Sequence, residues 1–203
     1  MKAVLISAHG DDALACAAGT IQSLVEDGHE VEHHTLSLSG ISLPEPFTTE
    51  DYADELSEAF GILEISNDIY GLTTRSFPDH RGTIRELLYG ITREADLIIT
   101  HSPTDTHQDH RVVGEEIMRV APKSSSILAY DMPWSSNKVP SAFYPMDTYA
   151  LEVKISALWQ LDSQQVKAPQ YLCPEAVEAL ARVRGLACGS QYAEAFECLR
   201  FVR

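Results

Sequence analysis

The chain has 203 residues, of which 44% are hydrophobic, and it carries 15 basic against 30 acidic residues, for a formal net charge of −15. This length predicts a single domain, residues 1–203, with a core that needs no disulfide. Strong acidity without a basic stretch argues against a protein that tracks nucleic-acid phosphates, so we expect a small or weakly charged ligand.

Strand-like and helix-like patterns alternate along the first 130 residues. Residues 3–8 form a short apolar run typical of a strand, and residues 12–28 place apolar side chains at helical spacing and end at Gly28. Further strands are predicted over 31–38, 69–72, 96–100 and 127–130, and further helices over 50–60, 81–95 and 114–120. This alternation predicts an α/β fold, a Rossmann-like three-layer sandwich with a mostly parallel sheet.

The last third of the chain has a different pattern. Residues 132–145 hold three prolines and little periodicity, which predicts a surface loop that could border a site. Beyond this loop we expect a strand over 149–153 and helices over 154–165 and 174–187. The remaining residues are too few to form a core of their own.

The first ten residues and the cysteines bear on where in the cell the protein is located. Residues 1–10 carry one basic residue and only a short apolar run, so we expect no export signal. No stretch approaches the ~20 apolar residues that a membrane span requires. The cysteines form no C-x-x-C pair, which predicts reduced thiols and a cytoplasmic location. They are Cys16, Cys173, Cys188 and Cys198.

Two segments rich in histidine and aspartate directly follow predicted strands. The first is Ala8-His9-Gly10-Asp11-Asp12, and the second runs over residues 101–110 and includes His101, His107, Asp109 and His110. The carboxyl ends of parallel strands meet at one edge of a sheet, where ligands bind in folds of this class. We therefore expect the two segments to meet in space.

The spacing within these segments favours a metal site. His9 and Asp12 are three residues apart across a strand-to-helix turn, so their side chains project to the same side. An imidazole from the second segment, for which we favour His110, would complete three ligands and leave a position open for water, as in catalytic zinc sites. Asp11 is then the candidate base, and His107 would face the developing oxyanion or the leaving group.

Each segment taken alone also has a structural interpretation. The first could be a helix cap followed by acidic residues that the helix dipole favours, and the second could be a polar start of a helix. Capping requires neither three histidines nor adjacent aspartates. The joint occurrence of both segments at matching strand ends therefore favours metal chemistry.

At these residues the chain resembles the LmbE-like (PIG-L) family of zinc-dependent de-N-acetylases. That family's first motif, A-H-P-D-D-E, corresponds here to A-H-G-D-D-A at residues 8–13, and its H-P-D-H motif corresponds to H-Q-D-H at residues 107–110. A third similarity is Y-A-E-A-F at residues 192–196. The resemblance thus spans nearly the whole chain.

The resemblance implies one zinc ion, or another divalent metal, held by His9, Asp12 and His110. It implies that Asp11 is the general base and that His107 stabilises the tetrahedral intermediate. Asp109 would then orient an imidazole, as residues behind metal ligands usually do.

Two positions depart from the family pattern. Gly10 replaces the proline of the first motif, and Ala13 replaces its glutamate. The expected ligands and the base are unaffected, so the departures bear on the orientation of the substrate and on efficiency.

Several weaker candidates have two interpretations each. Arg75 and Arg81, with His80, lie in a loop and would bind hydroxyl or phosphate groups of a substrate or be solvated. Trp134 would stack on a sugar ring or pack against a helix. Glu194 would brace the site, cap a helix or lie on a helix surface. His33 and His34 fall in a predicted strand and point to opposite faces, so neither is expected to be a ligand.

The sequence therefore predicts a hydrolase that removes the acetyl group from an N-acetylated amino sugar or its conjugate, with Asp11 or His107 returning the proton to the amine. Two alternatives remain: hydrolysis of another small amide such as a thiol conjugate, and a binding or partner protein that keeps the fold but has little turnover. The expected ligand is a small molecule, and the chain could form a homo-oligomer.

Overall fold

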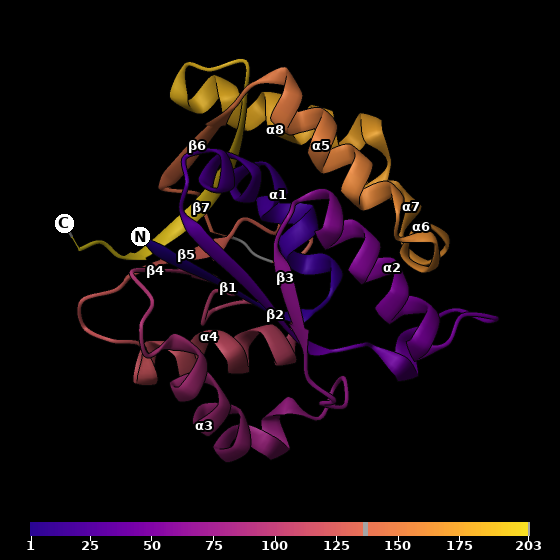
Figure 1. Cartoon of the computed structure of the whole chain (residues 1–203), viewed down its shortest axis with the longest axis vertical. Helices are drawn as coiled ribbons and strands as arrows, with labels where there is room; N and C mark the ends of the chain where they lie inside the picture. The colour runs from indigo at the N-terminus through magenta and orange to yellow at the C-terminus, as the bar shows by residue number, and fades with distance from the viewer. Residues whose placement is uncertain (136–137, 203) are drawn as a thin grey trace.

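The fold is built on one mixed sheet. The computed structural model describes residues 1–135 and 138–202, and in this part of the chain seven strands lie in the order β3-β2-β1-β4-β5-β7-β6 (Figure 1). The strands are β1 (Lys2–His9), β2 (Glu30–Ser37), β3 (Ser66–Ile69), β4 (Leu97–Thr100), β5 (Ser126–Tyr130), β6 (Ala142–Met146) and β7 (Tyr192–Arg200). Neighbours from β3 to β5 are parallel, and β7 runs antiparallel to both β5 and β6.

Helices cover both faces of this sheet, which confirms the predicted three-layer α/β fold (Figure 1). The helices are α1 (Asp11–Glu26), α2 (Thr49–Ile62), α3 (Arg81–Thr92), α4 (Gln108–Val120), α5 (Thr148–Trp159), α6 (Asp162–Lys167), α7 (Pro169–Leu172) and α8 (Pro174–Cys188), with 3-10 turns η1 (Gly40–Ser42) and η2 (Phe77–His80). Helices α3 and α4 lie on one face, and α1, α2, α5 and α8 lie on the other (Figure 1).

The central strand β1 contributes to the core on both faces. Leu5 belongs to the apolar cluster under α1 and α2, whereas Val4 and Ile6 belong to the cluster under α3 and α4. Successive side chains of a strand point to opposite faces, so a strand covered on both sides must be apolar throughout. This explains why residues 3–8 are apolar except for Ser7, whose buried hydroxyl lies 2.8 Å from Nε2 of His33.

The predicted strand over 149–153 is wrong, because these residues belong to α5. The buried side chains of this helix, Ala150, Leu151, Ala157 and Leu158, recur at helical spacing. Asp147 caps the helix by accepting the backbone N–H of Ala150 at 2.8 Å.

The two antiparallel strands were not predicted. Residues 142–145, which belong to the predicted loop, form the edge strand β6 together with Met146. Pro145 is tolerated there because an edge strand has an unpaired side. Residues 136 and 137 of that loop lie outside the described residues. β7 lies between β5 and β6, and the first five of its residues, Y-A-E-A-F, are all buried. The predicted strand over 69–72 is shifted, since β3 covers Ser66–Ile69.

The strand order reverses between β1 and β4. The chain leaves β1 through α1 toward β2 on one side, while β4 lies on the other side of β1. In open α/β sheets, ligands bind where neighbouring connections diverge in this way. His9 ends β1 and His101 directly follows β4 at this point.

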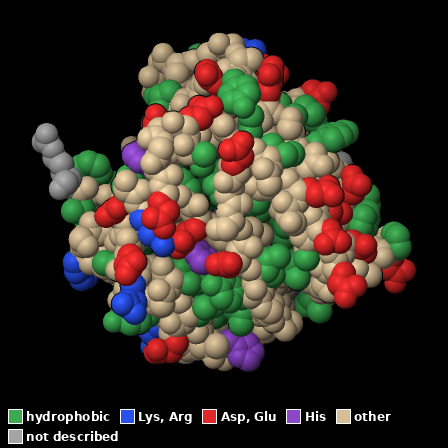
Figure 2. Space-filling view, in the orientation of Figure 1, with side chains coloured by type: hydrophobic (Ala, Val, Ile, Leu, Met, Phe, Trp, Pro, Cys, Tyr) green, Lys and Arg blue, Asp and Glu red, His purple; other side chains and the backbone are tan. Residues whose placement is uncertain are grey.

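The surface reflects the acidic composition. Figure 2 shows more acidic than basic side chains on the face in view, with acidic residues gathered where α2 lies. Among the described residues, no helix is long and apolar enough to cross a membrane.

Candidate metal centre

The first polar segment forms the tight turn from β1 into α1. His9 is the last residue of β1, and Asp11 and Asp12 open α1, where the helix dipole favours acidic side chains. Oδ2 of Asp12 accepts the backbone N–H of His9 at 2.8 Å and lies 3.6 Å from Nδ1 of the same residue. The turn therefore holds this imidazole and this carboxylate side by side.

Gly10 allows α2 to pack closely against the turn. A Cβ atom at this position would lie 2.4 Å from Cδ1 of Leu56 and 3.0 Å from the hydroxyl oxygen of Tyr52. The hydroxyl of the fully buried Tyr52 donates to Oδ1 of Asp11 at 3.3 Å. Glycine in place of the family proline thus makes room for α2. The close packing of α2 brings the hydroxyl of Tyr52 to Asp11, the candidate base. Ala13, the other departure, is fully buried in the core.

The second polar segment forms the start of α4. His107 is the N-cap residue, and its Nδ1 accepts the backbone N–H of Asp109 at 3.3 Å. Oδ1 of Asp105 accepts the N–H of His107 at 2.7 Å, and its Oδ2 lies 3.2 Å from Nδ1 of His110. The same Oδ2 accepts the hydroxyl of Ser135 at 2.9 Å. Asp105 therefore holds both histidines in place.

The two segments meet at the edge of the sheet. Nδ1 of His9 lies 3.2 Å from Nε2 of His110, and that Nε2 lies 3.6 Å from Oδ1 of Asp12. All three residues are buried. Two donor sets in this cluster have ligand atoms within 4.8 Å of one another: His9, His107 and His110, and Asp12, His101 and His110.

The charges of the cluster suit a cation. Burial alone would lower the pKa of His9, but Asp109 and Asp12 outweigh it and raise the pKa to about 10. Burial, followed by the charge of Asp12, raises the pKa of Asp11. The negative charge of these carboxylates would also favour a divalent ion, and Oδ1 of the buried Asp109 has no hydrogen-bond partner. The residues present therefore fit a metal ion with nitrogen and oxygen ligands.

Asp109 and His107 are both neighbours of His9. Oδ2 of Asp109 lies 3.3 Å from Nε2 of His9 and accepts the backbone N–H of Arg75 at 2.6 Å. Burial and the neighbouring imidazoles of His110 and His9 lower the pKa of His107 to about 4. His107 is therefore neutral near pH 7.

Three residues of the site received no role from the sequence. The fully buried ring of His101 stacks on His110 with centroids 4.0 Å apart, and its Nε2 lies 3.2 Å from Oδ2 of Asp12 and accepts the N–H of Ala8 at 2.9 Å. His101 and Asp105 lie within the second polar segment, so that segment could have signalled both. Tyr52 comes from another helix and gives no local signal.

A cleft of about 540 Å³ opens onto the cluster, a size that suits a small-molecule ligand. It is lined by His9, Asp11, Asp12, His107 and His110. Hydroxyl and cationic side chains also line it: Ser39, Ser42, Thr74, Thr106, Ser135, Arg75 and Lys167.

The candidate substrate contacts divide between the cleft and other places. Arg75 lines the cleft and has a left-handed backbone with φ of 69°. Trp134 also lines the cleft, is 40% exposed and stacks on Tyr171 of α7 at 4.6 Å between centroids. Arg81 is not among the described residues that line the cleft, because its guanidinium pairs with Glu115 and the buried Glu116 of α4.

Glu194 lies in β7 and not on a helix. Its buried carboxylate accepts the backbone N–H of Thr20 at 2.7 Å and lies 2.6 Å from Nζ of Lys154. These contacts join β7 and α5 to the middle of α1. His33 and His34 contact Ser7, Asn67, Glu32 and Tyr70.

A sequence model of a known family matches residues 4–121, more than half of the chain. That family is PIG-L, described as GlcNAc-PI de-N-acetylase. This chain belongs to the PIG-L family. The match covers both polar segments and confirms the resemblance stated from their motifs. No curated protein matches the sequence.

Solved structures share the fold of this PIG-L chain at low sequence identity. N,N'-diacetylchitobiose deacetylase from Pyrococcus horikoshii, with a bound inhibitor, is 20% identical, with a TM-score of 0.81 over 98% of this chain and 83% of that one. The zinc-inhibited form of teicoplanin deacetylase Orf2 is 16% identical, with a TM-score of 0.76 over 97% of each chain. The 4-carboxy-2-hydroxymuconate hydratase GalB from Pseudomonas putida KT2440 is 19% identical, with a TM-score of 0.76 over 100% of this chain and 97% of that one. At this identity the similarity concerns the fold, which serves deacetylases and a hydratase alike.

Proposed function

We propose that this protein is a zinc-dependent hydrolase that removes the acetyl group from an N-acetylated amino sugar or its conjugate. Membership of the PIG-L family supports deacetylation. The observation that carries the proposal is the approach of His9, Asp12 and His110 to within 3.2–3.6 Å of one another, in a cleft that Asp11 and His107 also line.

His9, Asp12 and His110 would hold the metal. Their ligand atoms approach one another at 3.2–3.6 Å, and Asp109 and Asp105 fix the outer sides of the two imidazoles. A bound zinc ion would polarise the amide carbonyl and lower the pKa of a water molecule.

Asp11 takes the proton of the attacking water. Its Oδ1 accepts the hydroxyl of Tyr52, which leaves Oδ2 free to receive that proton. Since Asp11 lines the cleft beside Asp12, its carboxylate is within reach of a substrate without being one of the three ligands.

His107 donates a hydrogen bond to the oxyanion of the tetrahedral intermediate. Because its Nδ1 accepts the N–H of Asp109, the neutral ring carries its proton on Nε2. Protonation of Nδ1 would break this N-cap, so His107 is a poor carrier of the proton to the amine. Asp11 is therefore the group that returns the proton to the leaving amine.

The walls of the cleft favour a hydroxylated substrate. Ser39, Ser42 and Thr74 offer hydroxyl groups, and Arg75 offers a guanidinium. Trp134 lines the same cleft, and an indole can stack on a sugar ring. These groups support an amino sugar as the substrate class.

Metal analysis coupled to acyl release tests this proposal. The purified protein is expected to hold about one zinc per chain and to release acetate from at least one member of a panel of N-acetyl sugars, nucleotide sugars and glycosides. His110→Ala protein, prepared in parallel, is the control for metal-dependent release. A zinc-loaded wild-type protein that releases no acyl group, or that hydrates an unsaturated acid instead, would overturn the proposal.

A further inference from the structure

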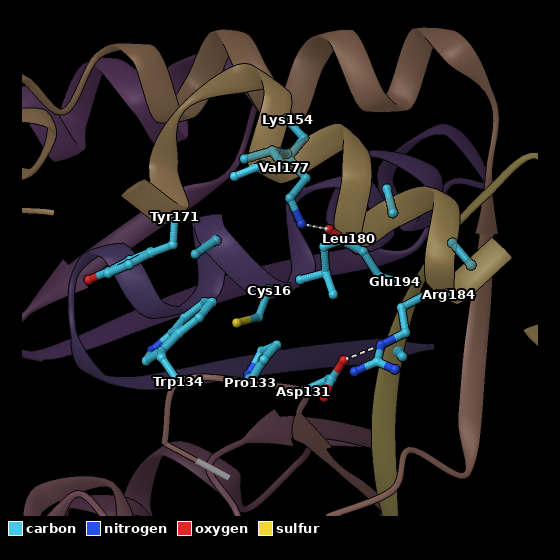
Figure 3. A pocket seen from close by; sticks show the side chains of 15 residues that line it. Cys16, Asp131, Pro133, Trp134, Lys154, Tyr171, Val177, Leu180, Arg184 and Glu194 are labelled. Atoms are coloured by element: carbon cyan, nitrogen blue, oxygen red, sulfur yellow. Dashed lines mark hydrogen bonds and ion pairs between the residues drawn. The ribbon is translucent and has the colours of Figure 1, made fainter. Parts of the chain in front are cut away.

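A second cavity, of about 210 Å³, adjoins the cleft (Figure 3). Ala15, Trp134 and Tyr171 line both spaces, so the second cavity shares a wall with the first. None of the candidate metal ligands lines it. We call it the side cavity.

The walls of the side cavity are largely apolar. Val177 and Leu180 of α8 face Pro133 and Cys16 across it (Figure 3). Ala181 of the same helix also lines it. Burial raises the pKa of the Cys16 thiol well above its usual range, so this side chain is an uncharged part of the wall.

The charged side chains of the side cavity already have partners. Nζ of Lys154 lies 2.6 Å from Oε1 of Glu194, and Nε of Arg184 lies 2.6 Å from Oδ2 of Asp131 (Figure 3). A charged ligand would have to compete with these pairs. The cavity therefore offers an apolar surface and no unbalanced charge.

We infer that the side cavity binds an uncharged apolar group of the substrate whose amide lies in the cleft. A cavity of about 150 Å³ holds benzene, so the side cavity accommodates about six to eight carbon atoms. This inference rests on the proposed function. The apolar group is either an acyl chain longer than acetyl or an apolar substituent on the amino sugar, and both present the same chemistry to these walls.

Fluorescence of Trp134 measures binding without turnover. The chain has two tryptophans, and Trp159 is 59% exposed, so Trp159→Phe leaves Trp134 as the single reporter. Hexyl β-D-glucoside and methyl β-D-glucoside have no amide to hydrolyse. Each methylene removed from water strengthens binding by about four-fold, so the hexyl compound is expected to bind at least about ten-fold more tightly.

Two variants of α8 and a matched control locate the effect. Ala176 lines the side cavity, and Ala176→Phe is expected to remove the advantage of the hexyl glucoside. Leu180→Ala enlarges the cavity and is expected to shift the preference to an octyl chain. Val183 is 55% exposed on the same helix, and Val183→Phe is expected to leave the preference unchanged. Circular dichroism melting checks the fold of each variant.

Turnover identifies the source of the apolar group. A lower KM for N-hexanoylglucosamine than for N-acetylglucosamine assigns the cavity to the acyl chain, and a lower KM for hexyl than for methyl N-acetylglucosaminide assigns it to the sugar substituent. The inference is overturned if hexyl and methyl glucoside bind equally to the wild-type protein, or if folded Ala176→Phe and Leu180→Ala proteins keep its chain-length preference. If no substrate is hydrolysed, the proposed function fails while the fluorescence titration still decides the side cavity.

Discussion

The hydroxyl of Tyr52 donates to Oδ1 of Asp11 across 3.3 Å and so joins the first turn of α2 to the first turn of α1. The contact orients the carboxylate that we propose as the general base. It exists because Gly10 lets α2 approach the turn.

Loss of the base, Asp11, is expected to lower kcat more than loss of Tyr52, which orients it. Asp11→Asn should lower kcat by about 10²–10⁴-fold, because the amide cannot accept a proton. Tyr52→Phe should lower kcat by about ten-fold, since a single hydrogen bond to the carboxylate is lost. Steady-state kinetics measures both. Zinc content should equal that of the wild-type protein in each, and full activity of Asp11→Asn would refute the assignment of the base.

The ligand assignment predicts which variants lose metal. His110→Ala and Asp12→Ala should sharply weaken zinc binding, because each removes one of three ligands. His107→Ala should keep the metal and lower kcat by about 10²–10³-fold, as expected for loss of a donor to an oxyanion. Competition with a chromophoric chelator measures the affinity. Equal zinc affinity in all three variants would show that the ligand set is different.

Substitution of Gly10 tests the packing of α2. Gly10→Ala is expected to lower the free energy of unfolding by about 1–3 kcal/mol, because the new methyl group collides with Leu56. Combined with Leu56→Ala, it should cost less than the sum of the single changes. Denaturant unfolding provides these values.

Gly90 is the matched control for this measurement. It lies in α3, and a Cβ atom added there would have nothing within 4 Å, so Gly90→Ala should raise stability by about 0.5–1 kcal/mol. Strict additivity of Gly10→Ala and Leu56→Ala would contradict the proposed contact.

The buried pair of Lys154 and Glu194 predicts a large effect on stability. Lys154→Met should lower the free energy of unfolding by about 3–5 kcal/mol, because it leaves a buried carboxylate without its cation. Adding Glu194→Gln should restore part of this loss. Arg182→Ala removes an exposed ion pair with Glu178 and a hydrogen bond to the hydroxyl of Tyr192, and it should be much milder than Lys154→Met. If Lys154→Met is as mild as this control, the pair makes no such contribution.

His33 predicts a loss of stability in acid. Burial, partly offset by a hydrogen bond to Asn67, lowers its pKa to about 3, whereas the unfolded chain has a value near 6.5. Between these values the unfolded state binds more protons, so stability is full above about pH 6.5 and falls as the pH decreases. For this group alone we expect a loss of about 2 kcal/mol between pH 7.5 and pH 5.

Unfolding in urea between pH 7.5 and pH 5 measures how steeply the free energy of unfolding depends on pH. His33→Asn should flatten this dependence, while His80→Asn, at an exposed position, should keep the slope of the wild-type protein. An unchanged slope in His33→Asn would assign the acid sensitivity to other groups.

The sequence predicted the parts of the molecule whose patterns are local. Buried parallel strands such as β1 and β4 are mostly apolar runs, and the polar residues after them must lie at one sheet edge. That reasoning alone brought His9, Asp12 and His110 together. The strand predicted within α5 was wrong because its β-branched and aromatic residues resemble a strand locally, while its burial follows a helical period.

Contacts between segments that are far apart in the chain have no local sequence pattern that would predict them. Tyr52 reaches Asp11 only because a glycine elsewhere opens the space, and a sequence does not record which helix fills it. β7 pairs with β5 and β6 from far along the chain, so the sequence around Glu194 is equally compatible with a surface position, and only the fold surrounds this carboxylate with Lys154 and Thr20.

Asp105 links an imidazole at the metal cluster to the segment that carries Trp134. Its Oδ2 lies 3.2 Å from Nδ1 of His110 and accepts the hydroxyl of Ser135, whose carbonyl in turn accepts the N–H of Thr106. A ligand that favours one orientation of the Asp105 carboxylate through Ser135 would also favour one orientation of His110, and a metal bound to His110 would act on Ser135 in return. By thermodynamic linkage the two coupling free energies are equal. We therefore expect a ligand that orders the cleft wall at Ser135 also to order the Asp105 carboxylate that holds His110, so that less entropy remains to be lost there.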